Sequence, residues 1–377
     1  MLPNDPTLDI ATFSRIFKKT TNSYKLLLFK SILTVITNNS HTNGVVDSRQ
    51  LANLMLAHAW IPSVYYKLNL GSQDQINNYL TELSMLNIDF VNKRLGYFDI
   101  IVDTINQSNT DGIVNKLMRY APFRLLAPFA DNNLVKCDDY AKNKLIASMI
   151  NNDFDKNYSI YKIKTNDSGK FIELIIHPYW LKYFKKNINI VHGWVNFNWI
   201  QYLQTKNPNT PSIPNKITLE KSRFSVAKQR EFWDLFLSKN AIECIFTGEI
   251  LTRSNYQLDH FLPWTYVAHN QYWNLIPIIS NCNSSKSNKL PNKSFIETYT
   301  AIHFKAMEYA IKNSKNAFLE DYLCTLHCTI DELSNEIEFK RKLAELIANL
   351  IDSAALQGFE QNWTWKQSDD SILQSEF

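Results

Sequence analysis

A group of polar residues between positions 244 and 289 combines ligands for a cation with a group that can transfer a proton. Asp259 and His260 are neighbours, Asn274 follows, and Asn283 and Lys286 lie near the end of the stretch. Carboxylate and amide oxygens are ligands that Mg²⁺ or Mn²⁺ accepts, and a neutral imidazole can take a proton from water. With a lysine nearby, these groups could hydrolyse a phosphodiester with the help of a divalent cation.

Two short elements would position these groups. Asp259 and His260 stand at the end of a short segment that is typical of a strand. Asn283 lies in the polar sequence Asn-Cys-Asn-Ser-Ser-Lys, residues 281–286, which is typical of a helix start. A strand and a helix in this order can bring Asn283 back as a second oxygen ligand to the cation that Asp259 holds.

The pattern resembles the HNH, or ββα-metal, endonuclease family. In that family a strand hairpin carries an Asp-His or His-His pair, a middle Asn or His follows, and a helix carries the last Asn or His. The resemblance rests on Asp-His-Phe-Leu-Pro-Trp at 259–264, Trp-Asn-Leu at 273–275 and Asn-Ser-Ser-Lys at 283–286, within roughly residues 240–295. The Asp-His…Asn…Asn form is closer to the HNH modules of RNA-guided nucleases and some phage resolvases than to the His-rich colicin form.

The resemblance implies a role for each residue. Asp259 and Asn283 would bind one Mg²⁺ or Mn²⁺, and His260 would be the general base. Asn274 would brace the loop and orient the His260 ring, and Lys286 would face the phosphate and stabilise its charge. The resemblance also implies products with a 5′-phosphate and a 3′-hydroxyl, and a single such site cuts one strand.

The cysteines depart from a common feature of this family, a zinc ion held by two Cys-x-x-Cys pairs. Here the first pair reads Cys244-Ile-Phe-Thr247 and the second reads Ile279-Ser-Asn-Cys282. Because a structural zinc site needs four N or S ligands, we expect no structural zinc. Two buried thiols are favoured over a disulfide or a metal site. Apolar packing would hold the finger, through Phe246, Leu258, Leu262, Leu275 and Ile278.

Bulk composition indicates a helical protein of two domains, with three as the alternative. The chain has 377 residues, 45% of them hydrophobic, with only 8 Gly and 12 Pro, which disfavours a turn-rich all-β fold. No apolar run is long enough to cross a membrane, and no secretory signal is recognisable. Five irregularly spaced Cys suit a reducing cytoplasm. Between Asn215 and Asn313, 12 Lys and Arg face 8 Asp and Glu, so this region accounts for the net charge of +4.

We therefore expect a fold that is mainly α with small β elements (α+β). Residues 1–205 would form a mainly helical recognition or regulatory domain with a β-hairpin near 158–176. Residues 206–224, which include three prolines, would form a linker. Residues 225–360 would form a C-terminal ββα-metal HNH nuclease domain, with its finger at 241–292 and flanking helices at 293–313 and 330–357. Residues 361–377 would be a loose tail.

The expected function is metal-dependent hydrolysis of phosphodiester bonds in DNA, most simply double-stranded DNA. By analogy with intracellular HNH nucleases that carry a large helical domain, the role would be that of a bacterial anti-phage defence or restriction effector. A mobile-element nuclease, a repair or RNA-directed nuclease, and a non-catalytic nucleic-acid-binding protein remain as alternatives. The N-terminal domain could serve a homodimer or a regulatory protein partner, and no membrane association is expected.

Three other features have a structural and a functional interpretation. Arg119-Tyr-Ala-Pro-Phe-Arg124 could contact nucleic acid, although a structural corner is favoured. Trp180, Trp194 and Trp199, with nearby lysines, could form a stacking surface, although a core position is favoured. His58, on an apolar helix face, is most simply a hydrogen-bonded core residue.

Overall fold

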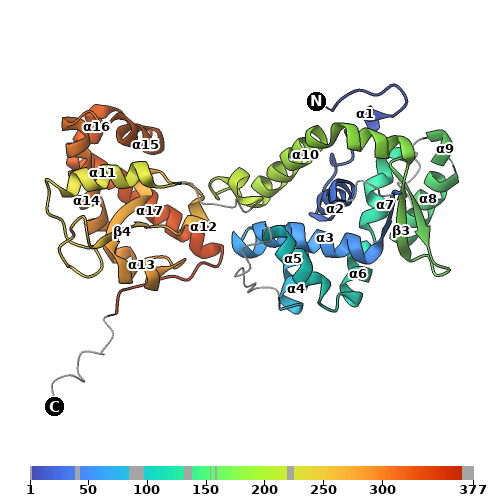
Figure 1. The fold of residues 1–377 in the computed structure, drawn as a ribbon, viewed down its shortest axis with the longest axis horizontal. Helices are drawn as coiled ribbons and strands as arrows, with labels where there is room; N and C mark the ends of the chain where they lie inside the picture. Colours follow the sequence, from blue (N-terminus) through green and yellow to red (C-terminus); the bar gives the residue numbers. More distant parts are fainter. Residues whose placement is uncertain are drawn as a thin grey trace, which may run out of the picture. The chain divides into compact units, whose positions relative to one another are not determined.

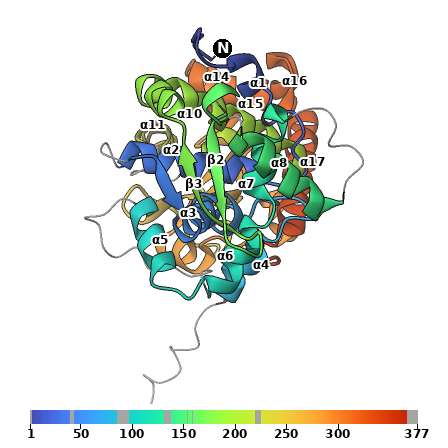
Figure 2. The same ribbon diagram turned by 90° about the vertical axis from the view of Figure 1, so that its right-hand side faces the viewer.

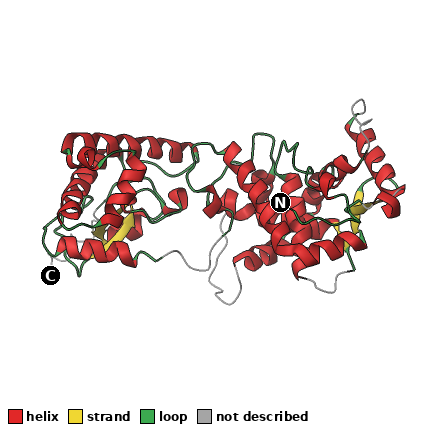
Figure 3. Cartoon of the chain, turned by 90° about the horizontal axis from the view of Figure 1, so that it is seen from above, coloured by secondary structure: helices red, strands yellow, loops and turns green. Residues whose placement is uncertain are grey.

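The computed structural model describes residues 2–38, 43–84, 97–130, 138–152, 154–157, 159–218 and 225–366. The chain divides into two compact units. The N-terminal unit consists of Met1–Pro208 and Ile213–Lys221, and the C-terminal unit consists of Asn209–Ser212 and Ser222–Phe377. Helices dominate both units, and within the described residues the strands form one three-stranded and one two-stranded sheet (Figures 1 and 3). The expected fold, mainly α with small β elements, is confirmed.

The N-terminal unit is built around a central helix, α2. The α-helices of this unit are α1 (Ile10–Phe13), α2 (Tyr24–Asn38), α3 (Ser48–Trp60), α4 (Ile76–Glu82), α5 (Tyr97–Asn106), α6 (Asp111–Met118), α7 (Ala121–Leu126), α8 (Asp139–Asn152), α9 (Phe154–Asn157) and α10 (Pro178–Lys206). The strands and other helical turns are β1 (Val45–Asp47), β2 (Tyr161–Thr165), β3 (Phe171–Ile176), η1 (Ile61–Tyr65), η2 (Ala127–Phe129) and η4 (Ile213–Lys216).

Helix α2 is buried because it is apolar on nearly all sides. Every residue from Leu26 to Ile36 is buried, and α3 and α10 pack against it. Trp180 and Trp199 on α10 are fully buried, which confirms the core interpretation for these two. Trp194 is partly buried, and its ring packs against those of Phe13 and Phe17. His58 of α3 lies 2.8 Å from the Thr34 hydroxyl through its Nε2 atom, as expected of a hydrogen-bonded core residue.

The sheet of this unit has the strand order β1-β3-β2, and both pairings are antiparallel. The expected hairpin corresponds to β2 and β3, joined by a turn in which Gly169 adopts a φ of +75°, a conformation that glycine permits. Strand β1 was not expected: Val46 pairs with Leu174, far along the chain. Helix α8 packs against β2, and Figure 2 shows α7 and α8 beside the hairpin.

One helix of this unit is shorter than the periodicity of its apolar residues suggests. Apolar residues recur at helical spacing over 8–19, but only Ile10–Phe13 forms a helix, α1. Beyond it the amides of Arg15, Ile16 and Lys18 donate to carbonyls three residues earlier, which is the pattern of tight turns. Helix α10 runs through Gly193 without interruption and has its non-helical residue at Asn187. Among the helices that the structure describes, none combines the length and the apolar character that crossing a bilayer requires.

The C-terminal unit places a small β-hairpin against a layer of helices. Its elements are α11 (Ala227–Leu237), β4 (Tyr256–His260), α12 (Trp264–Val267), η5 (Tyr272–Asn274), β5 (Leu275–Ile279), α13 (Ser280–Lys286), η6 (Lys293–Phe295), α14 (Ile296–Lys312), α15 (Asn316–Leu326), α16 (Ile330–Ser334) and α17 (Glu336–Leu356). The expected helix over 330–357 is divided at Asn335, whose side chain caps α17 by accepting a hydrogen bond from the Glu338 amide.

The segment after α17 packs on the finger as far as the structure describes it. Trp363 is 7% exposed, and its ring meets that of Phe246 at 4.8 Å in a T-shaped contact. Its amide donates to the Leu290 carbonyl at 2.9 Å. The loose tail expected from residue 361 is therefore not loose over 361–366, because Trp363 gains an apolar site; the rest of that segment lies outside the described residues.

Candidate active site

The candidate site is built on the β4–β5 hairpin and α13. Strands β4 and β5 pair antiparallel, with Asp259 opposite Ile276 and His260 opposite Leu275. Helix α13 begins directly after β5 and packs against both strands. The order strand, strand, helix thus places the Asp-His pair at the end of the first strand and Asn283 on the helix, as the sequence predicts.

The finger rests on apolar side chains and on the flanking helix α14. Of the five side chains expected to hold it, Phe246, Leu262, Leu275 and Ile278 are buried and Leu258 is partly buried. Phe261, next to His260, stacks on Tyr299 of α14 with ring centroids 4.1 Å apart. The Tyr299 hydroxyl also donates a hydrogen bond to the Trp273 carbonyl, so α14 fixes the loop that leads into β5.

Asp259 and Lys286 form a buried ion pair. The Lys286 Nζ lies 2.8 Å from the Asp259 Oδ2, and the side chains are 0% and 7% exposed. Burial raises the pKa of Asp259, while the Lys286 ammonium and the His260 backbone amide oppose that shift. Because a buried carboxylate is unstable without a partner, Lys286 is the group that allows Asp259 to be charged here.

The expected position of Lys286, facing the substrate phosphate, is not the one observed. Its ammonium also donates to the His260 carbonyl at 2.7 Å, so both contacts of the ammonium lie inside the finger. The physical reason is that the face of α13 bearing Lys286 packs on β4, which turns this side chain inward. Lys286 thereby holds both members of the Asp-His pair: it contacts the side chain of Asp259 and the backbone carbonyl of His260.

Asn283 lies one turn before Lys286 on α13 and bonds to the same strand. Its Nδ2 donates to the Gln257 Oε1 at 3.0 Å. Because side chains alternate along a strand, Gln257 and Asp259 share one face of β4. Along α13 and β4, Asn283 thus contacts Gln257 and Lys286 contacts Asp259. The hydrogen bond to Gln257 uses the Asn283 amide nitrogen and not its amide oxygen.

His260 is held by a residue that the motif does not contain. Its Nε2 lies 2.9 Å from the Asn270 Oδ1, and Asn270 lies in the loop between α12 and η5. A bond to a carbonyl oxygen requires the proton on Nε2, which leaves Nδ1 as the ring nitrogen able to accept a proton. Asn270 was missed because nothing in its spacing separates it from the many other asparagines of the chain.

Asn274 acts on the backbone that follows His260. It is fully buried, and its side chain accepts from the Leu262 amide at 2.8 Å and donates to the Leu262 carbonyl at 3.0 Å. Its own carbonyl accepts from the Phe261 amide at 2.8 Å. Asn274 therefore braces the loop, as the resemblance implies, but its side chain reaches the backbone two residues beyond the ring that it was expected to orient.

Cys244 and Cys282 lie side by side as buried free thiols. Burial and the neighbouring Cys244 raise the pKa of Cys282 to about 12. Among the described residues, no three His, Cys, Asp or Glu side chains gather in a group that could hold a metal ion. Oxygen ligands at the candidate site would instead come from Asp259 and the amides of Asn283 and Gln257.

Comparison with known proteins finds a family that matches the segment containing this site. A family described as HNH endonuclease matches residues 243–292, which include the hairpin and α13. No curated protein and no solved structure matches the chain. The matched segment contains the Asp-His pair, Asn274 and the helix with Asn283. The chain therefore carries a domain of the HNH endonuclease family at residues 243–292, which supports nuclease activity on a nucleic acid.

Proposed function

We propose that the protein is a metal-dependent endonuclease that hydrolyses phosphodiester bonds in DNA as a bacterial anti-phage defence or restriction effector. The observation that carries the chemical part is the placement of the Asp-His pair on β4 against α13, which holds Asn283 and Lys286 on the face toward that strand. The biological role rests on the analogy between this two-unit chain and other HNH effectors with a large helical domain.

The oxygen donors near β4 fit a hard divalent cation. Asp259 offers a carboxylate and Asn283 an amide oxygen, the ligand types that Mg²⁺ and Mn²⁺ prefer. When bound there, the cation would polarise the phosphate and stabilise negative charge as it develops. Since Lys286 already neutralises Asp259, these two residues carry no net charge together. Much of the attraction for a cation must then come from the substrate phosphate.

The remaining chemistry belongs to His260 and its neighbours. Asn270 directs the ring so that Nδ1 can take a proton from the attacking water. Lys286 fixes the His260 backbone, and Asn274 fixes the chain that follows. The contact of Lys286 with His260 and that of Asn274 with Leu262 each join residues more than ten positions apart in the sequence. The finger must therefore be folded before the general base is in place.

The proposal predicts cleavage of supercoiled plasmid by the full chain with Mg²⁺ or Mn²⁺, and no cleavage with EDTA. Open-circular product is expected first, because one HNH site cuts one strand. Agarose electrophoresis of parallel reactions with plasmid, structured RNA and branched DNA compares the DNA, RNA and repair substrates. Preferential cleavage of RNA or of branched DNA would contradict the proposed substrate, and cleavage that persists in EDTA would contradict the metal dependence.

Asn270→Ala should lower kcat by roughly 10- to 100-fold with little change in KM, as expected when a residue that orients a reactive group is removed. Asn270→Asp should restore the orientation of His260 and place a negative charge beside it. Such a charge favours protonated imidazole, so the pH at which activity falls on the acid side should move upward. Initial rates across pH for both variants make this measurement. An unchanged kcat in Asn270→Ala would remove Asn270 from the mechanism.

A further inference from the structure

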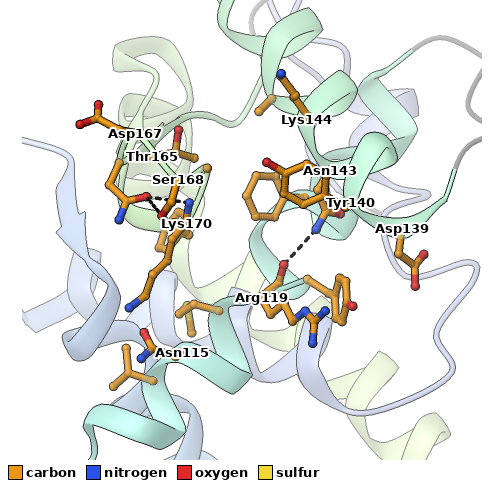
Figure 4. Close-up of a pocket in the computed structure, with 18 of the residues that line it drawn as sticks. Asn115, Arg119, Asp139, Tyr140, Asn143, Lys144, Thr165, Asp167, Ser168 and Lys170 are labelled. Carbon is orange, nitrogen blue, oxygen red and sulfur yellow. Dashed lines mark hydrogen bonds between the residues drawn. The ribbon is translucent and has the colours of Figure 1, made fainter.

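The N-terminal unit contains a cavity of about 630 Å³ between α6, α7, α8 and the β2–β3 hairpin (Figure 4). All of its lining residues lie between Val114 and Phe171, outside the HNH domain. Pockets for small ligands typically have volumes of about 300–1,000 Å³. The cavity is therefore large enough for one ring system with an attached polar group.

Four aromatic residues, Tyr120, Phe123, Tyr140 and Phe171, are among those that line the cavity. Phe123 and Phe171 are buried and meet edge to face, with ring centroids 6.4 Å apart. Tyr140 of α8 is 66% exposed, although it lines the cavity. Its hydroxyl reaches the hairpin turn, where a Cβ at Gly169 would lie 3.3 Å away. Exposed aromatic faces beside a cavity can stack on a planar ring, and every nucleobase offers one.

One of the three carboxylates that line the cavity is neutralised by an ion pair. Asp139 pairs with Arg124 at 2.7 Å. Asp138 accepts a hydrogen bond from the Ala141 amide at 2.8 Å, at the beginning of α8. Of the three lining carboxylates, Asp138 and Asp167 therefore have no ion-pair partner within the described residues.

The positive charge at the cavity is not neutralised in this way. Arg119, Lys144 and Lys170 line the cavity and are exposed. Within the described part of the chain, none of the three takes part in an ion pair, and the Arg119 guanidinium lies 5.0 Å from the centre of the Tyr120 ring. Three cations against two carboxylates that lack an ion-pair partner leave a net positive charge among these lining groups. This charge favours an anionic ligand, and phosphate is an anion that lysine and arginine bind well.

Asn143 adds an unused hydrogen-bond acceptor to the lining. Its Nδ2 donates to the Arg119 carbonyl at 2.9 Å, as the dashed line in Figure 4 shows. The residue is only 8% exposed, and its Oδ1 has no hydrogen-bond partner among the described residues. Buried polar atoms usually have partners. An N–H group of a ligand would supply one, and asparagine commonly recognises base edges through such bonds.

We propose that this cavity binds a nucleotide. The base lies against the aromatic wall near Tyr140, an N–H group of the base reaches Asn143, and the phosphate meets Lys144 and Lys170. The same chemistry is offered by a free nucleotide and by a nucleotide within a single strand. The site goes beyond the proposed nuclease function, because it lies in the other unit and needs no cleavage.

Calorimetric titration of the full chain in EDTA tests the proposal without interference from cleavage. The probes are AMP, CMP, GMP and dTMP, each alone, and a short single-stranded oligonucleotide of mixed sequence. Saturable binding of a mononucleotide would show that the cavity accepts a free nucleotide. Binding of the oligonucleotide alone identifies a nucleotide within a strand.

Two exposed residues provide variants that leave the fold intact. Tyr140→Ala and Lys170→Gln should each weaken binding by about tenfold, as expected for a lost stacking or phosphate contact. Phe197→Ala and Lys186→Gln, on the exposed surface of α10, are the matched controls and should bind as the wild type does. Absence of binding for every probe would overturn the proposal. Binding that Tyr140→Ala and Lys170→Gln leave unchanged would do so too, because it would belong to another surface.

Discussion

His260→Ala should lower the rate of plasmid cleavage by about 10²–10⁴-fold, the usual contribution of a general base. A histidine imidazole is the usual side chain for taking a proton from water, and Asn270 orients that of His260. Binding of DNA should persist, because His260 is expected to act on the attacking water. Single-turnover cleavage and an electrophoretic binding assay separate the two effects.

His269→Ala is the matched control for this experiment. His269 lies in the same loop region, and its ring packs against Trp273 with centroids 5.3 Å apart. Its Nδ1 accepts a hydrogen bond from the Gln271 amide, and it is not part of the Asp-His pair. Cleavage should therefore stay near the wild-type rate. Equal losses in both variants would indicate damage to the loop and would count against a specific role for His260.

Lys286→Met should destabilise the HNH domain by roughly 3–5 kcal/mol, the usual cost of leaving one member of a buried ion pair without its partner. The substitution keeps the length of the side chain but leaves Asp259 charged and buried, and the His260 carbonyl without its donor. Thermal unfolding combined with hydrogen exchange of peptides from 243–292 measures the loss and assigns it to this domain rather than to the N-terminal unit.

The pH dependence of Lys286→Met follows from the direction of the Asp259 shift. Burial raises the pKa of Asp259 in the folded protein, and Lys286 opposes that shift. Without Lys286 the folded pKa rises further above the unfolded value of about 3.9. Folding then favours the protonated carboxyl of Asp259. The contribution of this group to the free energy of unfolding is fully present below the unfolded pKa and is lost as pH rises through the folded pKa. The variant should therefore lose more stability at neutral pH than at acid pH.

Two further variants test this explanation. Lys289→Met breaks the exposed pair with Glu360, whose side chains are 38% and 66% exposed, and should cost less than about 1 kcal/mol. Asp259→Asn combined with Lys286→Met should recover much of the lost stability, because the buried uncompensated charge is gone. If the double variant is no more stable than Lys286→Met, the charge of Asp259 is not the cause of the loss.

The sequence by itself determined the local elements and the order of the site residues. Alternation and a glycine-containing turn are enough to indicate the β2–β3 hairpin, because both strands and their turn lie within one short segment. Likewise, Asp259, His260, Asn274 and Asn283 lie within one finger, where spacing along two strands and one helix largely fixes which residues meet. Sequence spacing also placed Asn283 and Lys286 on one side of α13.

Only the tertiary structure decided which way the side of α13 with Asn283 and Lys286 faces, and which other residues reach the site. Helical spacing groups residues on a face but does not say whether that face packs on a strand or meets the substrate. For this reason the burial of Lys286 against Asp259 could not be predicted. The bond from Asn270 to His260 closes across a loop, and the pairing of β1 with β3 joins distant segments. Such contacts depend on packing between elements, which the periodicity of any single element does not encode.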